Sequence, residues 1–173
     1  AATGLKIYEG YGMTEIAPIS INSEAYGVKP GSAGKAVPDT IIEIVDLDSG
    51  DRVLPTGEAG EIRVKGPHMM TGYTGNTEET AIALRHGFVY TGDIGTLDTE
   101  GFLTITDRKK NVIFVSGFNV FPREIEEMLL THPAISGACV VAREHARSGE
   151  VPVAFVTLRS DVDAGNIMAF CKD

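Results

Sequence analysis

Residues 107–122 read DRKKNVIFVSGFNVFP, and this stretch divides the chain into two parts with different patterns. A basic run precedes the apolar, β-branched run Val112–Val115, which predicts a strand. Ser116-Gly117 then predicts a tight turn, because glycine adopts positive φ at no steric cost. Pro122 favours the first position of a helix. The sequence therefore predicts a boundary between two small domains, residues 1–106 and 107–173.

The charge balance changes at the same place. Up to residue 106 the chain carries 7 basic and 15 acidic residues, and from residue 107 onward it carries 8 basic and 9 acidic ones. The whole chain of 173 residues has a formal net charge of −9. A protein that holds nucleic acid by its phosphates needs a basic face, so this composition argues against a nucleic-acid partner.

The overall composition is that of a globular protein, with 43% hydrophobic and 23% charged residues. No apolar run approaches the ~20 residues of a transmembrane helix, which leaves only peripheral membrane contact open. Cys139 and Cys171 lack metal-ligand spacing, and Cys139 lies in an apolar pattern that predicts a reduced core residue. A cytoplasmic location is expected. The chain begins without Met, so we expect it to be part of a longer protein.

The first part has mostly the pattern of β-strands. A helix is expected over 76–84, with Asn76 or Thr77 as its cap. Asp98 to Gly101 has the composition of a hairpin turn. Strands are predicted at 40–45, 60–66, 87–90, 94–98 and 102–106.

The second part alternates strands and helices. Ile125, Met128 and Leu129 give the helix over 122–130 an apolar face. Buried strands are predicted at 138–142 and 153–158, and a further helix begins at 164. This order is typical of a small α+β domain.

Two segments carry groups suited to a nucleotide. In Gly10-Tyr11-Gly12, the glycines allow a flat ligand to approach the backbone while Tyr11 stacks on it. Thr14 can donate to a phosphate oxygen, and Glu15 can hold Mg²⁺ beside that phosphate. On local grounds alone, an ordinary strand-to-loop turn with a surface Glu is favoured for these residues.

Two later residues fit the same ligand. Asp93 follows a Thr-Gly pair and can accept hydrogen bonds from a diol such as ribose, and Arg108 offers a planar fork to an oxygen-rich ligand. An ordinary turn at Asp93 and a solvated charge run at Arg108 remain as alternatives. Sequence order alone does not establish that these residues meet in space.

The ordered set of motifs resembles the adenylate-forming superfamily, which contains acyl-CoA synthetases, aryl-CoA ligases, luciferases and peptide-synthetase adenylation domains. The resemblance covers nearly the whole chain, and residues 107–126 are most similar to bacterial long-chain fatty-acid CoA ligases. The motifs are GYGMTE (10–15), GEAGEI (57–62), GY (72–73), YTGDIG (90–95), DRKK (107–110), SGFNV (116–120) and PREIE (122–126).

The resemblance implies a reaction in two steps, in which a carboxylate and ATP form an acyl-adenylate that then passes its acyl group to CoA. It implies that Thr14 touches the α-phosphate and that Glu15 binds Mg²⁺. It implies a hinge at Lys110. The other residues it implies are Gly10, Tyr11 and Gly12 at the adenine, Asp93 and Arg108 at the ribose, and Gly117 and Phe118 at CoA.

The fold implied by the resemblance is α+β: a small, β-rich, distorted barrel-like subdomain followed by an incomplete lid domain. The superfamily's Ser/Thr/Gly-rich phosphate loop and its catalytic Lys have no match here, and Lys172 is not assigned that role. We therefore expect a fragment of a fatty-acid CoA ligase that is inactive by itself.

Two alternatives stay open. One is an adenylating enzyme with another substrate or acceptor: an aryl-CoA ligase, an acyl-AMP ligase or a peptide-synthetase domain. The other is a non-catalytic binding module that keeps the fold. No sequence feature indicates the chain length of the acid or an oligomeric state.

Overall fold

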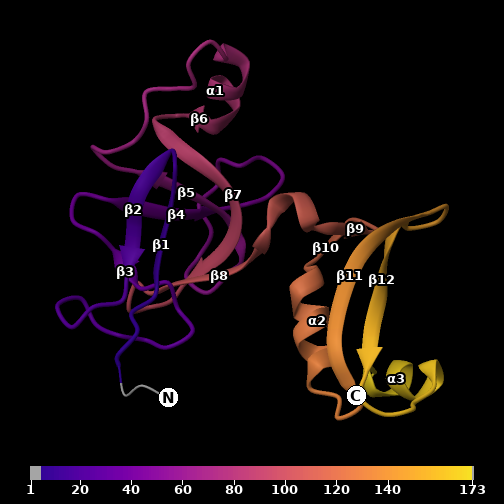
Figure 1. Ribbon diagram of the computed structural model, residues 1–173. Coiled ribbons are helices and arrows are strands. Elements are labelled where there is room, and N and C mark those ends of the chain that lie inside the picture. The colour runs from indigo at the N-terminus through magenta and orange to yellow at the C-terminus, as the bar shows by residue number, and fades with distance from the viewer. Residues whose placement is uncertain (1–4, 173) are drawn as a thin grey trace. The chain divides into compact units, whose positions relative to one another are not determined.

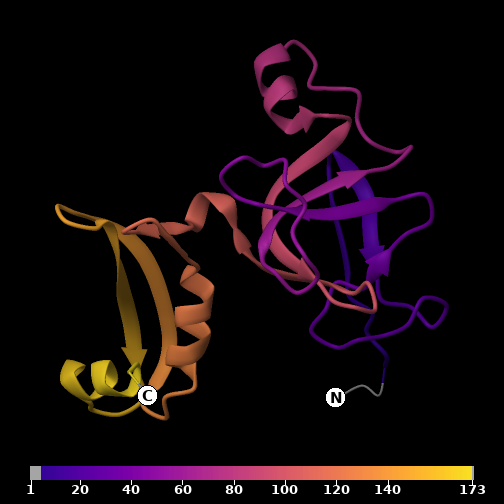
Figure 2. The ribbon, with the colours of Figure 1, turned by 180° about the vertical axis from the view of Figure 1, so that it is seen from behind.

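The computed structural model describes residues 5–172 of the chain (Figures 1 and 2). The chain divides into two compact units, residues 1–109 and 110–173. Each unit has its own cluster of buried apolar side chains.

The first unit begins with an antiparallel sheet of three strands. Strand β1 (Gly10–Met13) pairs with β2 (Ile16–Ile21), and β2 pairs with β3 (Lys35–Ala36). Thr14 and Glu15 form the two-residue turn between β1 and β2. The turn anticipated at this motif is therefore the tip of a hairpin.

A second sheet of five strands completes the first unit. Its order is β4 (Ile41–Val45), β5 (Gly60–Lys65), β7 (Phe88–Leu97) and β6 (Leu84–Arg85), and β8 (Leu103–Arg108) also pairs with β7. Helix α1 (Thr77–Ala83) precedes β6, and Asn76 caps it by accepting from the Glu79 amide. The helix predicted at 76–84 is confirmed.

The two sheets of the first unit share one core. Ile16 and Ile19 of β2 pack with residues of the second sheet, namely Ile44, Ile62, Val64, Val89 and Leu103. The α+β class is confirmed. The described strands of the first unit form two sheets and no closed barrel. The sheets are linked beside β3, where Lys35 bridges to Phe102 and the Leu103 amide donates to the Gly34 carbonyl at 2.9 Å.

The second unit is an antiparallel sheet with helices. Its strand order is β10 (Phe118–Val120), β9 (Ile113–Val115), β12 (Gly149–Leu158) and β11 (Ile135–His145). Helix α2 (Pro122–Leu130) packs on β11, and Ile167 of α3 (Ala164–Phe170) packs against the core formed by Ile113, Leu129, Ile135 and Val140. The helix predicted from Pro122 to Leu130 has these bounds in the structure.

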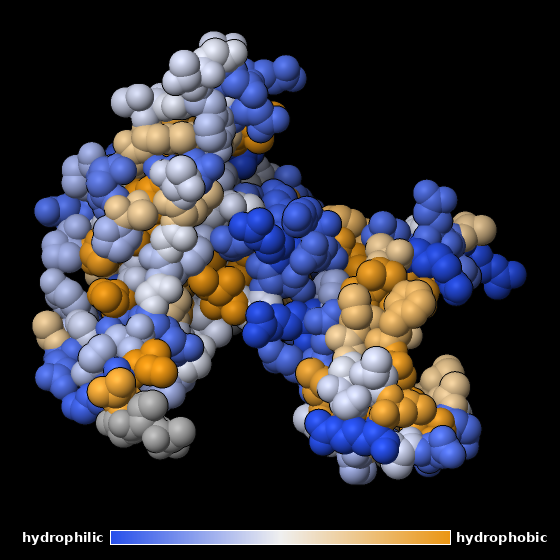
Figure 3. Space-filling model, in the orientation of Figure 1, coloured by the Kyte–Doolittle hydropathy of each residue, from blue (hydrophilic) through white to orange (hydrophobic). Residues whose placement is uncertain are grey.

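The prediction of two buried strands in this unit is wrong for one sheet face. Val140 is buried on the face that α2 covers, whereas Val141 and Phe155 are exposed. Cys139 pairs with Phe155 across the strands and is also exposed, so it is not a core residue. Figure 3 shows apolar side chains at the surface of this unit. Apolar residues on both faces of a strand predict burial on both faces. No described helix covers the sheet face that carries Cys139, Val141 and Phe155.

The helices of the described residues are short. None of them is long and apolar enough to cross a membrane.

Candidate functional site

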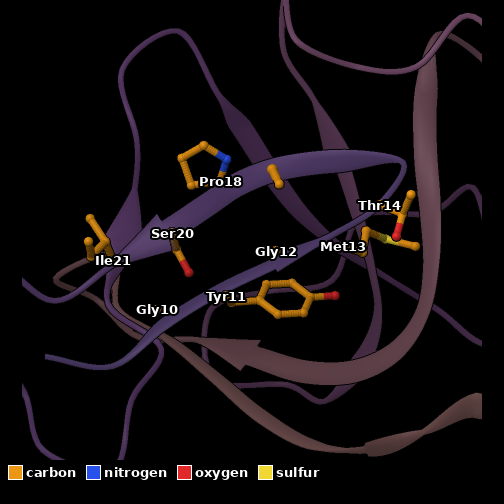
Figure 4. Close-up of a pocket in the computed structure, with 9 residues that line it drawn as sticks. Gly10, Tyr11, Gly12, Met13, Thr14, Pro18, Ser20 and Ile21 are labelled. Atoms are coloured by element: carbon orange, nitrogen blue, oxygen red, sulfur yellow. The ribbon is translucent and has the colours of Figure 1, made fainter.

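The hairpin β1–β2 presents a shallow cavity of about 680 Å³ along its glycine-containing strand. Figure 4 shows Tyr11 beside Gly12 at this cavity, which Gly10, Met13, Thr14, Pro18, Ser20 and Ile21 also line. A Cβ atom on Gly12 would lie 3.3 Å from the Cβ of Ala17. Glycine therefore permits the close approach of the two strands beneath the cavity.

A bulge in β7 sets the direction of Asp93. Strand β5 pairs Glu61 with Ile94 and Arg63 with Tyr90, so Ile62 alone faces three residues of β7. Gly92 within this bulge has φ of +70°. The Thr91 hydroxyl donates to the Ile62 carbonyl at 2.8 Å and accepts from the Asp93 amide at 3.1 Å. The turn expected at Thr-Gly-Asp is thus a bulge inside one long strand, and bulges re-aim side chains.

Asp93 receives one donor at each carboxylate oxygen. The Tyr11 hydroxyl donates to Oδ2 at 2.6 Å, and Arg108 Nε donates to Oδ1 at 2.7 Å. Asp93 is 6% exposed, and Arg108 lies directly opposite it in the pairing of β7 with β8. Burial and the hydrogen bond to Asp93 raise the pKa of the Tyr11 phenol above its ordinary value. Three residues selected from distant motifs therefore meet in one cluster.

Glu15 is held by a residue to which the sequence assigned no role. The Tyr73 hydroxyl donates to Glu15 Oε1 at 2.6 Å, and the Met70 amide donates to the Glu15 carbonyl at 2.8 Å. The hydrogen bond to Glu15 and desolvation raise the pKa of Tyr73 to about 12. The GY motif at 72–73 was the only sequence signal for this residue.

The Glu15 carboxylate has one oxygen, Oε1, in a hydrogen bond with Tyr73. It is half-buried, and among residues 5–172 nothing donates a hydrogen bond to its Oε2 atom. No group of three or more His, Cys, Asp or Glu side chains that could hold a metal occurs in the described part of the chain. A single carboxylate fits Mg²⁺, which keeps several waters and takes its remaining ligands from substrate phosphates.

The other predicted site residues lie in the second unit. Lys110 is in the short 3₁₀ helix η1 (Lys109–Asn111), the point at which the chain passes from one unit to the next. Gly117 has φ of +85° in the turn between β9 and β10, as expected for a tight hairpin. Phe118 follows it and is 75% exposed.

Two family models match this chain, one after the other. The model of the AMP-binding enzyme family matches residues 1–74, and that of the AMP-binding enzyme C-terminal domain matches residues 124–173. The long-chain-fatty-acid–CoA ligase of Bacillus subtilis (strain 168) is 44% identical over 173 residues. The chain belongs to the adenylate-forming enzyme family.

Other members of the adenylate-forming family are similar over almost the whole chain. The 4-coumarate–CoA ligase of Pinus taeda is 40% identical over 168 residues, which are 94% of this chain and 31% of that protein. The crystal structure of ATP-bound MatB from Rhodopseudomonas palustris matches with a TM-score of 0.88 and 34% identity, over 98% of this chain and 34% of MatB. The match to the B. subtilis ligase covers 98% of this chain and 31% of the ligase. The chain thus spans about a third of the length of these relatives.

Proposed function

We propose that this chain contributes part of the nucleotide site and most of the second domain of an ATP-dependent acyl-CoA synthetase. In the first step a fatty-acid carboxylate attacks the α-phosphorus of ATP, giving acyl-AMP and pyrophosphate. In the second step the CoA thiol attacks the acyl carbon, releases AMP and loses its proton. The observation that carries the proposal is the buried Asp93 carboxylate with a separate donor at each oxygen.

The ribose of the nucleotide is proposed to bind at Asp93. A carboxylate has about four lone-pair positions, and Tyr11 and Arg108 use one at each oxygen. One position at each oxygen is left for a vicinal diol, which donates two hydrogen bonds. The adjoining glycines Gly10 and Gly12 leave space beside the Tyr11 ring for a flat adenine.

The phosphates are proposed to lie at the tip of the β1–β2 hairpin. Thr14 is exposed there and offers its hydroxyl to the α-phosphate, and Glu15 offers one carboxylate oxygen to Mg²⁺. When bound, Mg²⁺ would neutralise the charge that develops on the phosphate oxygens. Tyr73 keeps the Glu15 carboxylate in one orientation through its 2.6 Å hydrogen bond.

The second unit is proposed to act in the thioester-forming step. Lys110 is assigned to the hinge between the units, and a rotation there would exchange the residues that close the nucleotide site. The exposed Phe118 and the tight turn at Gly117 are assigned to contact with CoA. Support for these roles comes from the family resemblance of the motifs that contain them.

A fatty acid is favoured as the carboxylate substrate because the 44% identity to a long-chain ligase extends over 98% of the chain. An aryl carboxylate is the second candidate, because the 4-coumarate ligase of pine is 40% identical. The two are chemically close, since only the group attached to the carboxylate differs.

The test is a turnover assay on the product of the complete gene that encodes this chain. Fatty acids of several lengths and 4-coumarate are supplied with ATP, Mg²⁺ and CoA, and AMP, pyrophosphate and thioester are quantified. We expect a fatty acid to yield all three in equal amounts. Preferred turnover of 4-coumarate would establish the second candidate, and acyl-AMP without thioester would identify an acyl-AMP ligase.

The chain of 173 residues by itself is expected to form no acyl-CoA, because about two thirds of the length of its relatives has no counterpart in it. Thioester formation by this chain alone would refute that expectation.

A further inference from the structure

An ion pair between a buried carboxylate and a half-exposed lysine lies outside the proposed nucleotide site. Glu61 of β5 is only 3% exposed, and its Oε2 atom lies 2.7 Å from Lys109 Nζ. Arg85 of β6 approaches the same oxygen at 4.0 Å. A buried carboxylate requires such partners, because removal from water is costly for an unpaired charge.

Lys109 lies at the boundary between the two units of the chain. Lys109 is the last residue of the first unit, and Lys110 is the first residue of the second. Arg108, which donates to Asp93, directly precedes Lys109. The pairing of β8 with β7 also ends at Arg108. Beyond that residue, the side chain of Lys109 is the next described attachment of the chain to the five-stranded sheet.

We propose that Glu61 is a positioning residue that fixes Lys109 to the first unit. This contact keeps Arg108 at Asp93 while the second unit moves, so that bending begins at Lys110. The proposal depends on the proposed function for the hinge at Lys110, but the contact between Glu61 and Lys109 does not.

The neighbouring charges decide which substitution is most informative. Glu61→Gln would remove the negative charge that Arg85 and Lys109 share, but its amide oxygen could still accept a hydrogen bond from Lys109. Lys109→Met keeps a long side chain and leaves Arg85 near Glu61. It therefore removes the attachment of the linker and leaves Arg85, at 4.0 Å, as the remaining cation beside the Glu61 carboxylate. Lys109→Arg retains the charge and should restore the contact.

The matched control is Lys29→Met. Lys29 also pairs with a carboxylate of the first unit, that of Asp98, and its side chain is similarly half-exposed. Lys29 lies between β2 and β3, far along the sequence from the linker. Loss of this ion pair should leave the linker unchanged.

The experiment is amide hydrogen exchange, followed by mass spectrometry, on the complete gene product without substrates. In Lys109→Met the peptide covering residues 107–112 should exchange about tenfold faster, whereas peptides of β5 and β7 keep their rates. Lys109→Arg should return the rate to within about threefold of the original. Lys29→Met should change nothing in this peptide.

Two results would overturn the proposal. An unchanged rate over 107–112 in Lys109→Met would mean that the pair does not hold the linker. Equal acceleration of all peptides of the first unit would mean that the pair only stabilises the fold. Because no substrate is present, a failure of the ligase assay leaves this result unaffected, and the reverse is also true.

Discussion

The Tyr11 hydroxyl donates a hydrogen bond of 2.6 Å to Asp93, a residue 82 positions later in the chain. The bond joins the β1–β2 hairpin to the bulge in β7. It also places the aromatic ring proposed for adenine beside the carboxylate proposed for ribose. One contact thus connects two motifs that look unrelated along the sequence.

Removal of this hydroxyl should weaken both the fold and the nucleotide site. Tyr11→Phe leaves the buried Asp93 with one donor fewer, so we expect a loss of about 1–3 kcal/mol in the free energy of unfolding. The affinity of the complete gene product for AMP should fall about tenfold, because the carboxylate is no longer held in one orientation. Chemical denaturation and calorimetric titration with AMP measure the two effects.

Tyr26→Phe is the control for this substitution, since Tyr26 is exposed and no described group accepts from its hydroxyl. Tyr26→Phe should change neither the free energy of unfolding nor the affinity for AMP. Tighter AMP binding in Tyr11→Phe would show that Tyr11 competes with the nucleotide for Asp93, which contradicts the orienting role.

The bulge at Gly92 should be needed for the direction of Asp93. Gly92 has φ of +70° with no atom within 4 Å of an added Cβ, and Gly57 has φ of +88° with the same open space. Alanine at either position should therefore cost a similar ~1–2 kcal/mol in stability through backbone strain alone. Only Gly92→Ala should also weaken AMP binding, measured by calorimetric titration. Equal AMP affinity in the two variants would show that the bulge has no role in the site.

The contact between Tyr73 and Glu15 should affect metal binding. Mn²⁺ serves as the paramagnetic probe, and its binding to the complete gene product is measured with ATP present. Tyr73→Phe should lower the affinity for Mn²⁺ about tenfold, because loss of a hydrogen bond that supports a metal ligand commonly has an effect of this size. Glu15→Gln should lower it further. Tyr8→Phe removes a comparable Tyr–Glu contact, the one to Glu24, and should have no effect. Unchanged Mn²⁺ binding in Glu15→Gln would exclude Glu15 as the ligand.

The turn that contains Asp46 and Ser49 lies outside the proposed site, and an acid titration tests whether it forms in solution. Hydrogen bonds from the Ser49 hydroxyl, Arg52 and the amides of Ser49 and Gly50 outweigh desolvation and lower the pKa of Asp46 to about 2. The unfolded value is about 3.9, so the stabilising contribution is complete above that pH and is lost as the pH falls through about 2.

Ser49→Ala should raise the pKa of Asp46 toward its ordinary value, since Ser49 is the largest contributor. Carboxyl chemical shifts followed by NMR during acid titration measure this pKa. An ordinary value for Asp46 in the unsubstituted chain would show that the turn is not formed in solution.

Local rules of sequence predicted several elements well. Pro122 marked the first residue of α2, Asn76 capped α1, and Gly101 closed the hairpin between β7 and β8 with φ of +83°. In each case the deciding interaction lies within a few residues along the chain. Propensity and capping rules are sufficient there.

The parts that sequence reasoning missed depend on contacts between distant residues. The Thr-Gly pair before Asp93 suggested a turn, but the pairing of β5 with β7 makes it a bulge. Tyr73 reaches Glu15 across 58 positions, and no local pattern indicates that hydrogen bond. The apolar residues on both faces of the strand that contains Cys139 predict a core position, but the face with Cys139 is exposed.

The central claim is that Asp93 binds the ribose of the nucleotide in an acyl-CoA synthetase. The most direct measurement is the fatty-acid-dependent exchange of pyrophosphate into ATP by the complete gene product and its Asp93→Asn variant. We predict exchange that requires a fatty acid, with a KM for ATP raised at least about tenfold in the variant. Absence of exchange with every carboxylate tested, or an unchanged KM for ATP in Asp93→Asn, would contradict it.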